Sequence, residues 1–178
     1  MADSSKLVPF ILSWETDKYT NNKYDRGKAT KYGITLATWR KVGYDKNGDG
    51  VLNEEDVKLL TKDDFYRVFK QNYWNACKAD QIQDQSVANM LVDFAYNSGV
   101  SKAVKHLQLV LGITADGIIG NKTLFAINKS NGEILFEAFK KDRKTYLKRI
   151  AVGDQKRFLK GWLRRLSYIN YGNLKLNK

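Results

Sequence analysis

The strongest constraint on the fold is the helical periodicity that runs through almost all of the 178 residues. Apolar side chains recur every three or four residues, as on one face of an α-helix, whereas the alternation typical of strands is scarce. The single proline, Pro9, lies near the start of the first expected helix, where a missing N–H costs little. These features predict an all-α, mainly helical fold with one short β-hairpin near residues 19–35.

Capping residues and glycines divide this periodic pattern into separate helices. The first is expected over roughly residues 6–15, and Thr35 can act as the N-cap of the next. A strongly apolar helix ends at Gly99, since glycine is a common C-terminal stop. Two long amphipathic helices close the chain, and no linker or repeat interrupts it. We therefore expect two lobes packed as one unit, over residues 1–83 and 84–178.

The chain is strongly basic. Lys and Arg together number 31 against 19 Asp and Glu, which gives a formal net charge of +12 and a pI near 9.6. Such a field favours anionic polymers, namely nucleic acid, acidic lipid surfaces or the bacterial wall, and it equally serves solubility. Charge alone does not select among these partners.

Two rare residue types limit the chemistry. Cys77 is the only cysteine, so no intramolecular disulfide can form and the fold depends on its core. His106 is the only histidine, which excludes a metal site with several histidines. Both are interpreted as structural. No apolar run reaches transmembrane length, and the N-terminal apolar stretch is too short, and too soon interrupted by Pro9, for a signal peptide.

Glu15 is the first candidate for chemistry. It ends a helix that is otherwise apolar, and the partial negative charge at a helix C-terminus disfavours an ionised carboxylate there. The neighbouring Trp14 would desolvate the carboxyl further if the two share a pocket. A carboxyl that keeps its proton near neutral pH is what a glycosidase needs to protonate a leaving oxygen.

Asp25 and Thr30 follow Glu15 in a polar, glycine-containing segment. If this loop turns back towards the helix end, the carboxylate and the hydroxyl could hold a water on the far face of a sugar. Asp17 is a rival second carboxylate. A solvated glutamate followed by a polar turn would produce the same spacing, so the residues alone leave both interpretations open.

The segment that starts at Glu15 resembles the N-terminal motif of the family-108 glycoside hydrolases, which are bacterial and phage N-acetylmuramidases. Glu15 takes the place of the family's catalytic glutamate. The later part of the motif is matched by Asp25, Gly27, Thr30, Gly33, Ile34 and Thr35. The sequence departs from the family where Thr16-Asp17 replaces a Gly-Gly pair and Lys28 replaces a second glycine. These departures predict a reshaped entry to the cleft.

The C-terminal half is similar to the peptidoglycan-associated region of the same family. It carries the family's order of an Asp-Phe-x-x-Asn-x-Gly run, then a Leu-Gln pair, then an Asp-Gly-x-Ile-Gly turn. The resemblance implies a set of residues that line the glycan cleft: Tyr32, Asp93, Tyr96, Asn97 and Gln108. Helix packing and capping are the alternative roles for these side chains.

Residues 45–56 resemble the calcium loop of an EF-hand. Oxygen donors fall at the expected positions, and Gly50 occupies the sixth position, where the chain must turn sharply. The predicted metal ligands are Asp45, Asn47, Asp49, Val51 through its carbonyl, Asn53 and Asp56. Asp56 stands where a bidentate glutamate is preferred, which predicts weaker binding. A metal-free polar turn is the alternative, and calcium here would be structural.

Together these resemblances imply a lysozyme-like peptidoglycan hydrolase, an N-acetylmuramidase that needs no catalytic cofactor. Glu15 would be the general acid for cleavage of the MurNAc–GlcNAc β-1,4 bond, with Asp25 and Thr30 opposite. Residues 1–83 would form the catalytic lobe, and residues 84–178 a peptidoglycan-binding-like lobe. The alternatives are a lytic transglycosylase and a catalytically decayed wall-binding or secretion-associated protein.

Bacterial peptidoglycan is thus the expected partner, met by a monomer in the periplasm or outside the cell. Nucleic acid is not expected, because the sequence contains no nucleic-acid-recognition motif. Without a signal peptide, delivery would require holin-type release or another non-standard route. Both a phage endolysin and a bacterial wall-remodelling enzyme fit this expectation.

Overall fold

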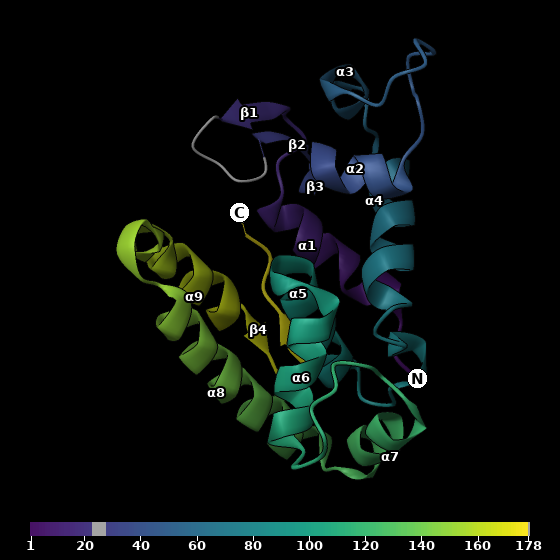
Figure 1. Ribbon diagram of the computed structural model, residues 1–178. Coiled ribbons are helices and arrows are strands. Elements are labelled where there is room, and N and C mark those ends of the chain that lie inside the picture. Colours follow the sequence, from purple (N-terminus) through teal and green to yellow (C-terminus); the bar gives the residue numbers. More distant parts are fainter. Residues whose placement is uncertain (23–27, 178) are drawn as a thin grey trace.

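The computed structural model describes residues 1–22 and 28–177, and it confirms the predicted, mainly helical fold. The expected hairpin is present as a small antiparallel sheet, in which Thr30 is opposite both Thr20 and Thr35. Its strands are β1 (Thr20–Asn22), β2 (Lys28–Lys31) and β3 (Ile34–Thr35). The sheet therefore follows the first helix directly and turns the chain back across its C-terminal end (Figure 1).

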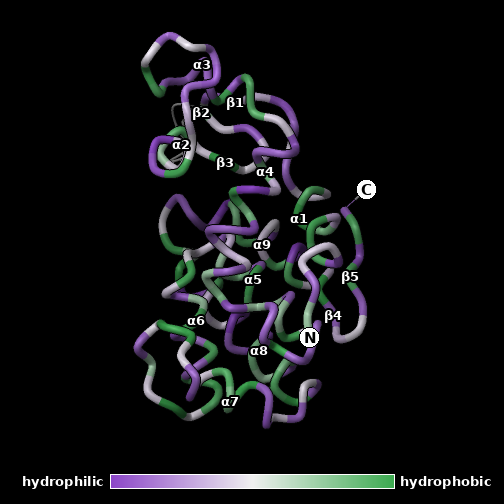
Figure 2. The backbone as a smooth tube through the Cα atoms, turned by 90° about the vertical axis from the view of Figure 1, so that its right-hand side faces the viewer, coloured by the Kyte–Doolittle hydropathy of each residue, from purple (hydrophilic) through white to green (hydrophobic). Residues whose placement is uncertain are grey.

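The N-terminal half is built from short helices. They are α1 (Val8–Trp14), α2 (Leu36–Val42), α3 (Glu54–Lys58) and α4 (Lys62–Phe69), with a 3-10 turn at Ser4–Lys6 and a π-helical turn at Lys70–Trp74. Thr35 caps α2 as predicted, because its hydroxyl accepts the Thr38 N–H at 3.1 Å. The loop between α2 and α3 is hydrophilic and lies at the opposite end of the molecule from α7 (Figure 2).

The C-terminal half contains the longer helices. They are α5 (Gln85–Ser98), α6 (Val100–Val110), α7 (Asn121–Lys129), α8 (Gly132–Ile150) and α9 (Leu159–Ser167), with 3-10 turns at Ala79–Gln81 and Gly153–Phe158. A second small sheet pairs β4 (Ile169–Asn170) with β5 (Asn173–Leu174). Among the described residues, no helix is long and apolar enough to cross a membrane.

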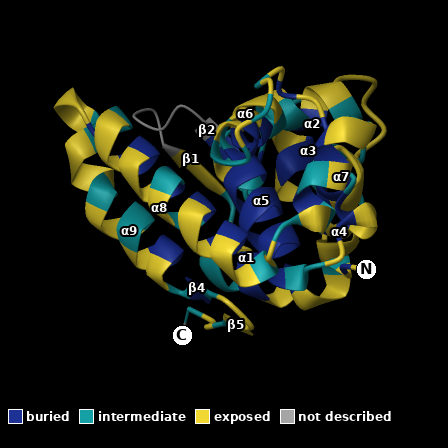
Figure 3. Cartoon of the chain, turned by 90° about the horizontal axis from the view of Figure 1, so that it is seen from below, coloured by how far each residue is buried: buried dark blue, intermediate teal, exposed yellow. Residues whose placement is uncertain are grey.

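Helix α5 is the centre of the fold. Its residues from Ser86 to Ala95 are all buried, and it packs against both α6 and α8 (Figure 3). The buried apolar side chains form one cluster that extends along the chain from Ala2 to Ile169. This continuous core holds α1, at whose end Glu15 lies, against the C-terminal helices.

The two rare residue types are both packed into this structure. Cys77 is buried, and burial raises the pKa of its thiol to about 12, so the thiol stays protonated and unreactive near neutral pH. The His106 Nδ1 lies 2.6 Å from an Asp142 carboxylate oxygen, and its ring packs against Phe94 and Tyr146. The Cys77 backbone N–H donates to the Tyr73 carbonyl at 3.0 Å, which adds to the packing role of this residue.

Candidate active site

Glu15 lies immediately after α1, where the backbone leaves the helix for an extended conformation. The helix is anchored by buried Phe10 and Ile11, which fixes the position of its C-terminal end. The Glu15 side chain is 18% exposed, so it is accessible from solvent on one side. The adjacent Trp14 ring meets the Tyr168 ring edge-on at 5.3 Å between centroids and supplies an apolar neighbour.

Arg165 of α9 forms an ion pair with Glu15. Its Nη1 lies 2.9 Å from Glu15 Oε1, while its Nε and Nη2 donate to Asp93 Oδ1 at 3.0 and 2.8 Å. The second Asp93 oxygen accepts a hydrogen bond from Arg143 Nη2 at 2.7 Å. Two carboxylates and two guanidiniums therefore form one continuous chain of ion pairs that leads from the core to Glu15.

At the buried end of the ion-pair chain, Asp93 and the two arginines change each other's pKa values. Burial by itself would raise the pKa of fully buried Asp93, but the charges and hydrogen bonds of Arg165 and Arg143 lower it below its ordinary value. Burial likewise opposes the charge on Arg165, yet Asp93 and Glu15 raise the pKa of its guanidinium. Arg165 thus stays charged, and its hydrogen bonds to Asp93 hold it next to the Glu15 carboxylate.

The turn between β2 and β3 covers the other side of Glu15. Both of its residues have left-handed backbones, with φ of 51° at Tyr32 and 70° at Gly33. A Cβ placed on Gly33 would lie only 2.7 Å from Glu15 Oε2 and 2.1 Å from the Tyr96 hydroxyl. Only glycine therefore allows this close approach, which explains the residue at position 33.

Tyr96 of α5 completes the surroundings of the carboxylate. Its hydroxyl donates to the Tyr32 carbonyl at 3.1 Å, and its ring lies 5.0 Å from that of Tyr73. Burial, followed by the negative charge of Glu15, raises the pKa of Tyr96 well above its ordinary value. The same two causes raise the pKa of Tyr73. Both tyrosines are therefore neutral hydrogen-bonding groups at neutral pH.

A Gly33→Ala substitution is expected to destabilise the fold and to reduce activity. The new methyl group would displace either the Tyr96 hydroxyl or the Glu15 carboxyl, and the left-handed backbone adds strain of about 1–3 kcal/mol. Gly172→Ala is the matched control, because Gly172 has the same φ of 70° but a Cβ placed on it would meet no atom within 4 Å. Equal loss of melting temperature and activity in both variants would show that the contact at Gly33 is unimportant.

The structure brings together several of the predicted site residues. Tyr32, Asp93 and Tyr96 all belong to the environment of Glu15, although buried Asp93 reaches it only through Arg165. Asn97, at the exposed end of α5, donates its amide to the Asp93 carbonyl at 2.6 Å.

Of the other two predicted catalytic residues, Thr30 and Asp25, the structure describes only Thr30. Thr30 lies in β2, one residue before the strand ends and beside the turn that covers Glu15. The predicted partner Asp25 lies outside the described residues. The pairing of Asp25 with Thr30 therefore stays a prediction.

Gln108 lies elsewhere, in α6. Its side chain is only 1% exposed, and its amide nitrogen donates to Asp116 Oδ1, to the Ile118 carbonyl and to Thr123 Oγ1. Its amide oxygen accepts the Gly117 N–H at 2.8 Å. These bonds hold the turn between α6 and α7, which favours the packing role over direct contact with a glycan.

Sequence reasoning missed Arg165 and Arg143. Arg165 lies in α9 one turn after Trp162 and directly before buried Leu166, within an amphipathic segment of the chain. A charged residue at such a core position signals a buried ion pair, because an unpaired buried charge is very costly. That signal was present in the sequence, but it does not name the partner.

The predicted metal loop forms a compact polar turn. Asp45 accepts the Gly48 and Gly50 N–H groups, both at 2.7 Å, through its two carboxylate oxygens. The oxygens of fully buried Asp56 accept the Lys46 and Asn53 N–H groups at 2.7 and 2.8 Å. Over the described ranges, no group of three or more His, Cys, Asp or Glu side chains is arranged to hold a metal ion. Calcium binding by this loop stays a prediction.

Calcium is expected to raise the melting temperature of the protein relative to a sample in chelator. Free Ca²⁺ at a concentration about a hundredfold above its Kd would stabilise the folded state by about 2.7 kcal/mol. Thermal unfolding in Ca²⁺, in Mg²⁺ and in chelator measures the effect, and Asp49→Ala, which removes a predicted ligand, should abolish the difference between Ca²⁺ and chelator. The loop would be a metal-free turn if wild type unfolds at one temperature in all three conditions.

Comparison with known proteins defines the class. The sequence profile of Glycosyl hydrolase 108 matches residues 8–99, and that of a predicted peptidoglycan domain matches residues 102–167. The solved structure of SagA from Brucella abortus is similar over 98% of this chain and 95% of that chain, at 33% identity and a TM-score of 0.79. No curated protein matches the chain. The protein is thus a glycoside hydrolase directed at peptidoglycan.

The chain belongs to the glycosyl hydrolase 108 family, as its motifs predicted. The two matched regions meet at the junction of α5 and α6. Glu15 and Asp93 come from the first region, whereas Arg143 and Arg165 come from the second. The ion-pair chain therefore joins the two regions at the candidate site, and each region contributes residues to it.

Proposed function

We propose that the protein is an N-acetylmuramidase that hydrolyses the β-1,4 bond between N-acetylmuramic acid and N-acetylglucosamine. The observation that carries this proposal is the environment of Glu15. Its partly exposed carboxyl lies at the end of α1, where it pairs with the Arg165 guanidinium and lies close to the turn at Gly33. A single positioned carboxyl of this kind suits the general acid of a glycosidase.

In this mechanism the protonated Glu15 gives its proton to the glycosidic oxygen while the bond from that oxygen to the sugar C1 breaks. The leaving sugar departs as an alcohol, and positive charge develops on the ring that stays. Water then adds to C1 and loses its proton. The carboxylate that Glu15 becomes lies 2.9 Å from Arg165 Nη1, which can donate a hydrogen bond to it.

Asp25, with Thr30, is the proposed partner on the opposite face of the sugar. It would position the attacking water or stabilise the developing positive charge. The position of Thr30 in β2, next to the turn that contacts Glu15, supports this role. Asp17 is the rival carboxylate, and it is exposed to solvent.

The basic surface supports action on the bacterial wall, which carries negative charge. A net charge of +12 concentrates the enzyme on such a polymer and accelerates encounter. We propose that the protein acts there as a monomer, outside the cytoplasm. Wall remodelling by a bacterium and wall lysis by a phage are both compatible with this activity.

Product analysis tests the proposal. Purified peptidoglycan is digested with wild type, and the soluble products are reduced and identified by mass spectrometry. Reduced N-acetylmuramic acid at the new ends is the expected result. Reduced N-acetylglucosamine would move the cleavage to the other bond, and 1,6-anhydro ends would make the enzyme a lytic transglycosylase. Absence of any product would favour a wall-binding protein with a decayed site.

A further inference from the structure

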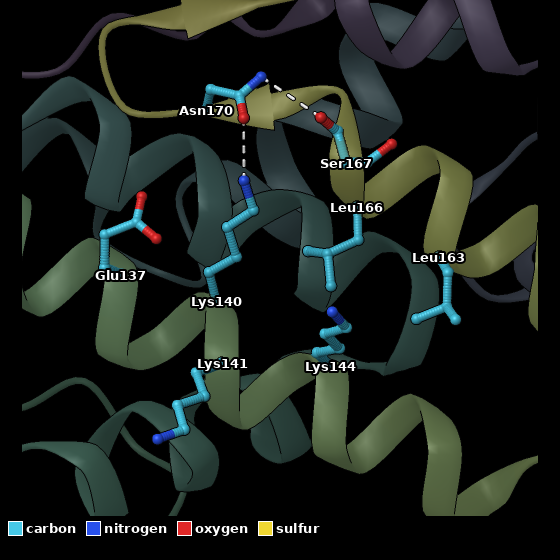
Figure 4. Close-up of a pocket in the computed structure, with 8 residues that line it drawn as sticks. All are labelled: Glu137, Lys140, Lys141, Lys144, Leu163, Leu166, Ser167 and Asn170. Carbon is cyan, nitrogen blue, oxygen red and sulfur yellow. Dashed lines mark hydrogen bonds between the residues drawn. The ribbon is translucent and has the colours of Figure 1, made fainter.

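A groove of about 510 Å³ lies between α8 and α9, away from Glu15 (Figure 4). Glu137, Lys140, Lys141 and Lys144 of α8 line one wall, and Leu163 and Leu166 of α9 line the other. Ser167 and Asn170 close the end at which the chain leaves α9. The groove thus combines a cationic wall with an apolar one.

Helix geometry separates this groove from the candidate active site. The α8 residues recur at intervals of three and four, which places them along one stripe of the helix. Leu163, Leu166 and Ser167 have the same spacing on α9. Arg165, which lies between them in sequence, directs its guanidinium towards Asp93 and Glu15 instead. One face of α9 therefore serves the ion-pair chain, and another forms the groove.

The groove holds three lysines and one carboxylate, Glu137 of α8, whose negative charge acts on Lys140. No ion pair joins Lys140, Lys141 or Lys144 to a carboxylate in the described part of the chain, although Glu137 lies one turn away on α8. Lys140 Nζ donates instead to the neutral Asn170 amide oxygen at 3.0 Å. Burial lowers the pKa of Lys140, Glu137 opposes this, and nearby Lys144 lowers it further. A bound anion would relieve this imbalance.

We propose that the groove binds the stem peptide of peptidoglycan, and this inference rests on the proposed function. Stem peptides carry carboxylates, which can pair with the lysines of α8, and alanine methyl groups, which can pack on Leu163 and Leu166 of α9. Apart from Asn170, these groove residues lie inside the region 102–167, which matches the peptidoglycan domain. The groove would then hold the peptide branch of the substrate, separate from the glycan strand at Glu15.

Titration calorimetry with a synthetic stem pentapeptide tests this inference. The double variant Lys140→Gln/Lys144→Gln is expected to bind at least about tenfold more weakly than wild type, because two charge-assisted contacts are lost. Lys122→Gln, on exposed α7, removes the same charge outside the groove and should bind as wild type does. Wild-type affinity in the double variant would overturn the proposal.

Two further measurements test whether a variant is still folded and where the peptide binds. Lys144→Glu changes only an exposed side chain, so it should weaken binding while the melting temperature stays at the wild-type value. Amide chemical shifts of wild type should change on peptide addition around Leu163, Ser167 and Asn170. Shifts confined to other surfaces would contradict the assignment, as would binding of a phosphate polymer such as teichoic acid in place of the peptide.

The peptide titration also separates this inference from the proposed function. Glu15→Gln should bind the peptide as well as wild type does, since Glu15 lies outside the groove. If wild type binds the peptide but cleaves no glycan, the muramidase proposal fails and the groove assignment stands. If wild type cleaves peptidoglycan but the peptide does not bind, the groove assignment alone fails.

Discussion

Glu15→Gln is expected to lower kcat/KM on purified peptidoglycan by about 10²–10⁴-fold, because the amide has no acidic proton to donate. The substitution keeps the shape of the side chain, and its oxygen can still accept the hydrogen bond from Arg165 Nη1. The variant should therefore fold like wild type. Release of soluble reducing sugar, together with thermal unfolding of the same samples, measures both expectations.

Asp17→Asn is the matched control for this prediction. Asp17 lies two residues from Glu15 and is exposed, so its neutralisation changes the local charge equally without touching the proposed acid. Activity close to wild type is expected. Full activity of Glu15→Gln would remove Glu15 from the mechanism, and a large loss in Asp17→Asn alone would transfer the role to Asp17.

Asp93→Ala is expected to reduce the free energy of unfolding by about 3–5 kcal/mol, which is the usual effect of removing one partner from a buried ion pair. The loss would leave the Arg143 and Arg165 guanidiniums buried without their shared counter-charge. Urea unfolding measures the difference. Glu55→Ala, which breaks the exposed Lys58–Glu55 pair, should change stability little.

A stability loss in Asp93→Ala no larger than that in Glu55→Ala would show that the buried ion pairs contribute little. Activity should fall together with stability in Asp93→Ala, because Arg165 loses the hydrogen bonds that orient it towards Glu15. Asp93→Asn keeps the size of the side chain, so it separates the effect of the lost charge from the effect of the space that Asp93→Ala leaves empty.

The lowered pKa of Asp93 also predicts that the stability of the fold depends on pH. Since Arg165 and Arg143 hold the pKa of Asp93 below its ordinary value of 3.8, its ionised form stabilises the folded state. This contribution is fully present above pH 3.8 and is lost as the pH falls through the lower, folded-state value. Wild type should therefore lose stability below about pH 4 more steeply than Asp93→Asn.

Local sequence signals predicted much of the fold. The helical periodicity, the Thr35 cap and the hairpin near residues 19–35 depend on neighbours within a few residues, and the structure contains all three. The position of Glu15 at the end of an apolar helix was also readable, because it depends only on where the helix stops.

The surroundings of Glu15 were beyond these local signals. Arg165 lies 150 positions from Glu15 and 72 from Asp93 along the chain, and no periodicity links residues so far apart. The helix-end argument considered only the local dipole, whereas the structure also places the Arg165 guanidinium 2.9 Å from the Glu15 carboxyl. Gln108 shows the opposite case. Its motif suggested a contact with substrate, but its side chain forms hydrogen bonds with Asp116 and Gly117 in the turn after α6.

The central claim, that Glu15 is the proton donor, is tested most directly by changing the leaving group of the substrate. Wild type and Glu15→Gln are compared on a natural glycan and on a 2,4-dinitrophenyl glycoside of the same sugar, whose leaving group departs without a proton. The account predicts a loss of about 10²–10⁴-fold on the glycan and a much smaller loss on the dinitrophenyl substrate. An equal loss on both substrates, or no loss on the glycan, would contradict it.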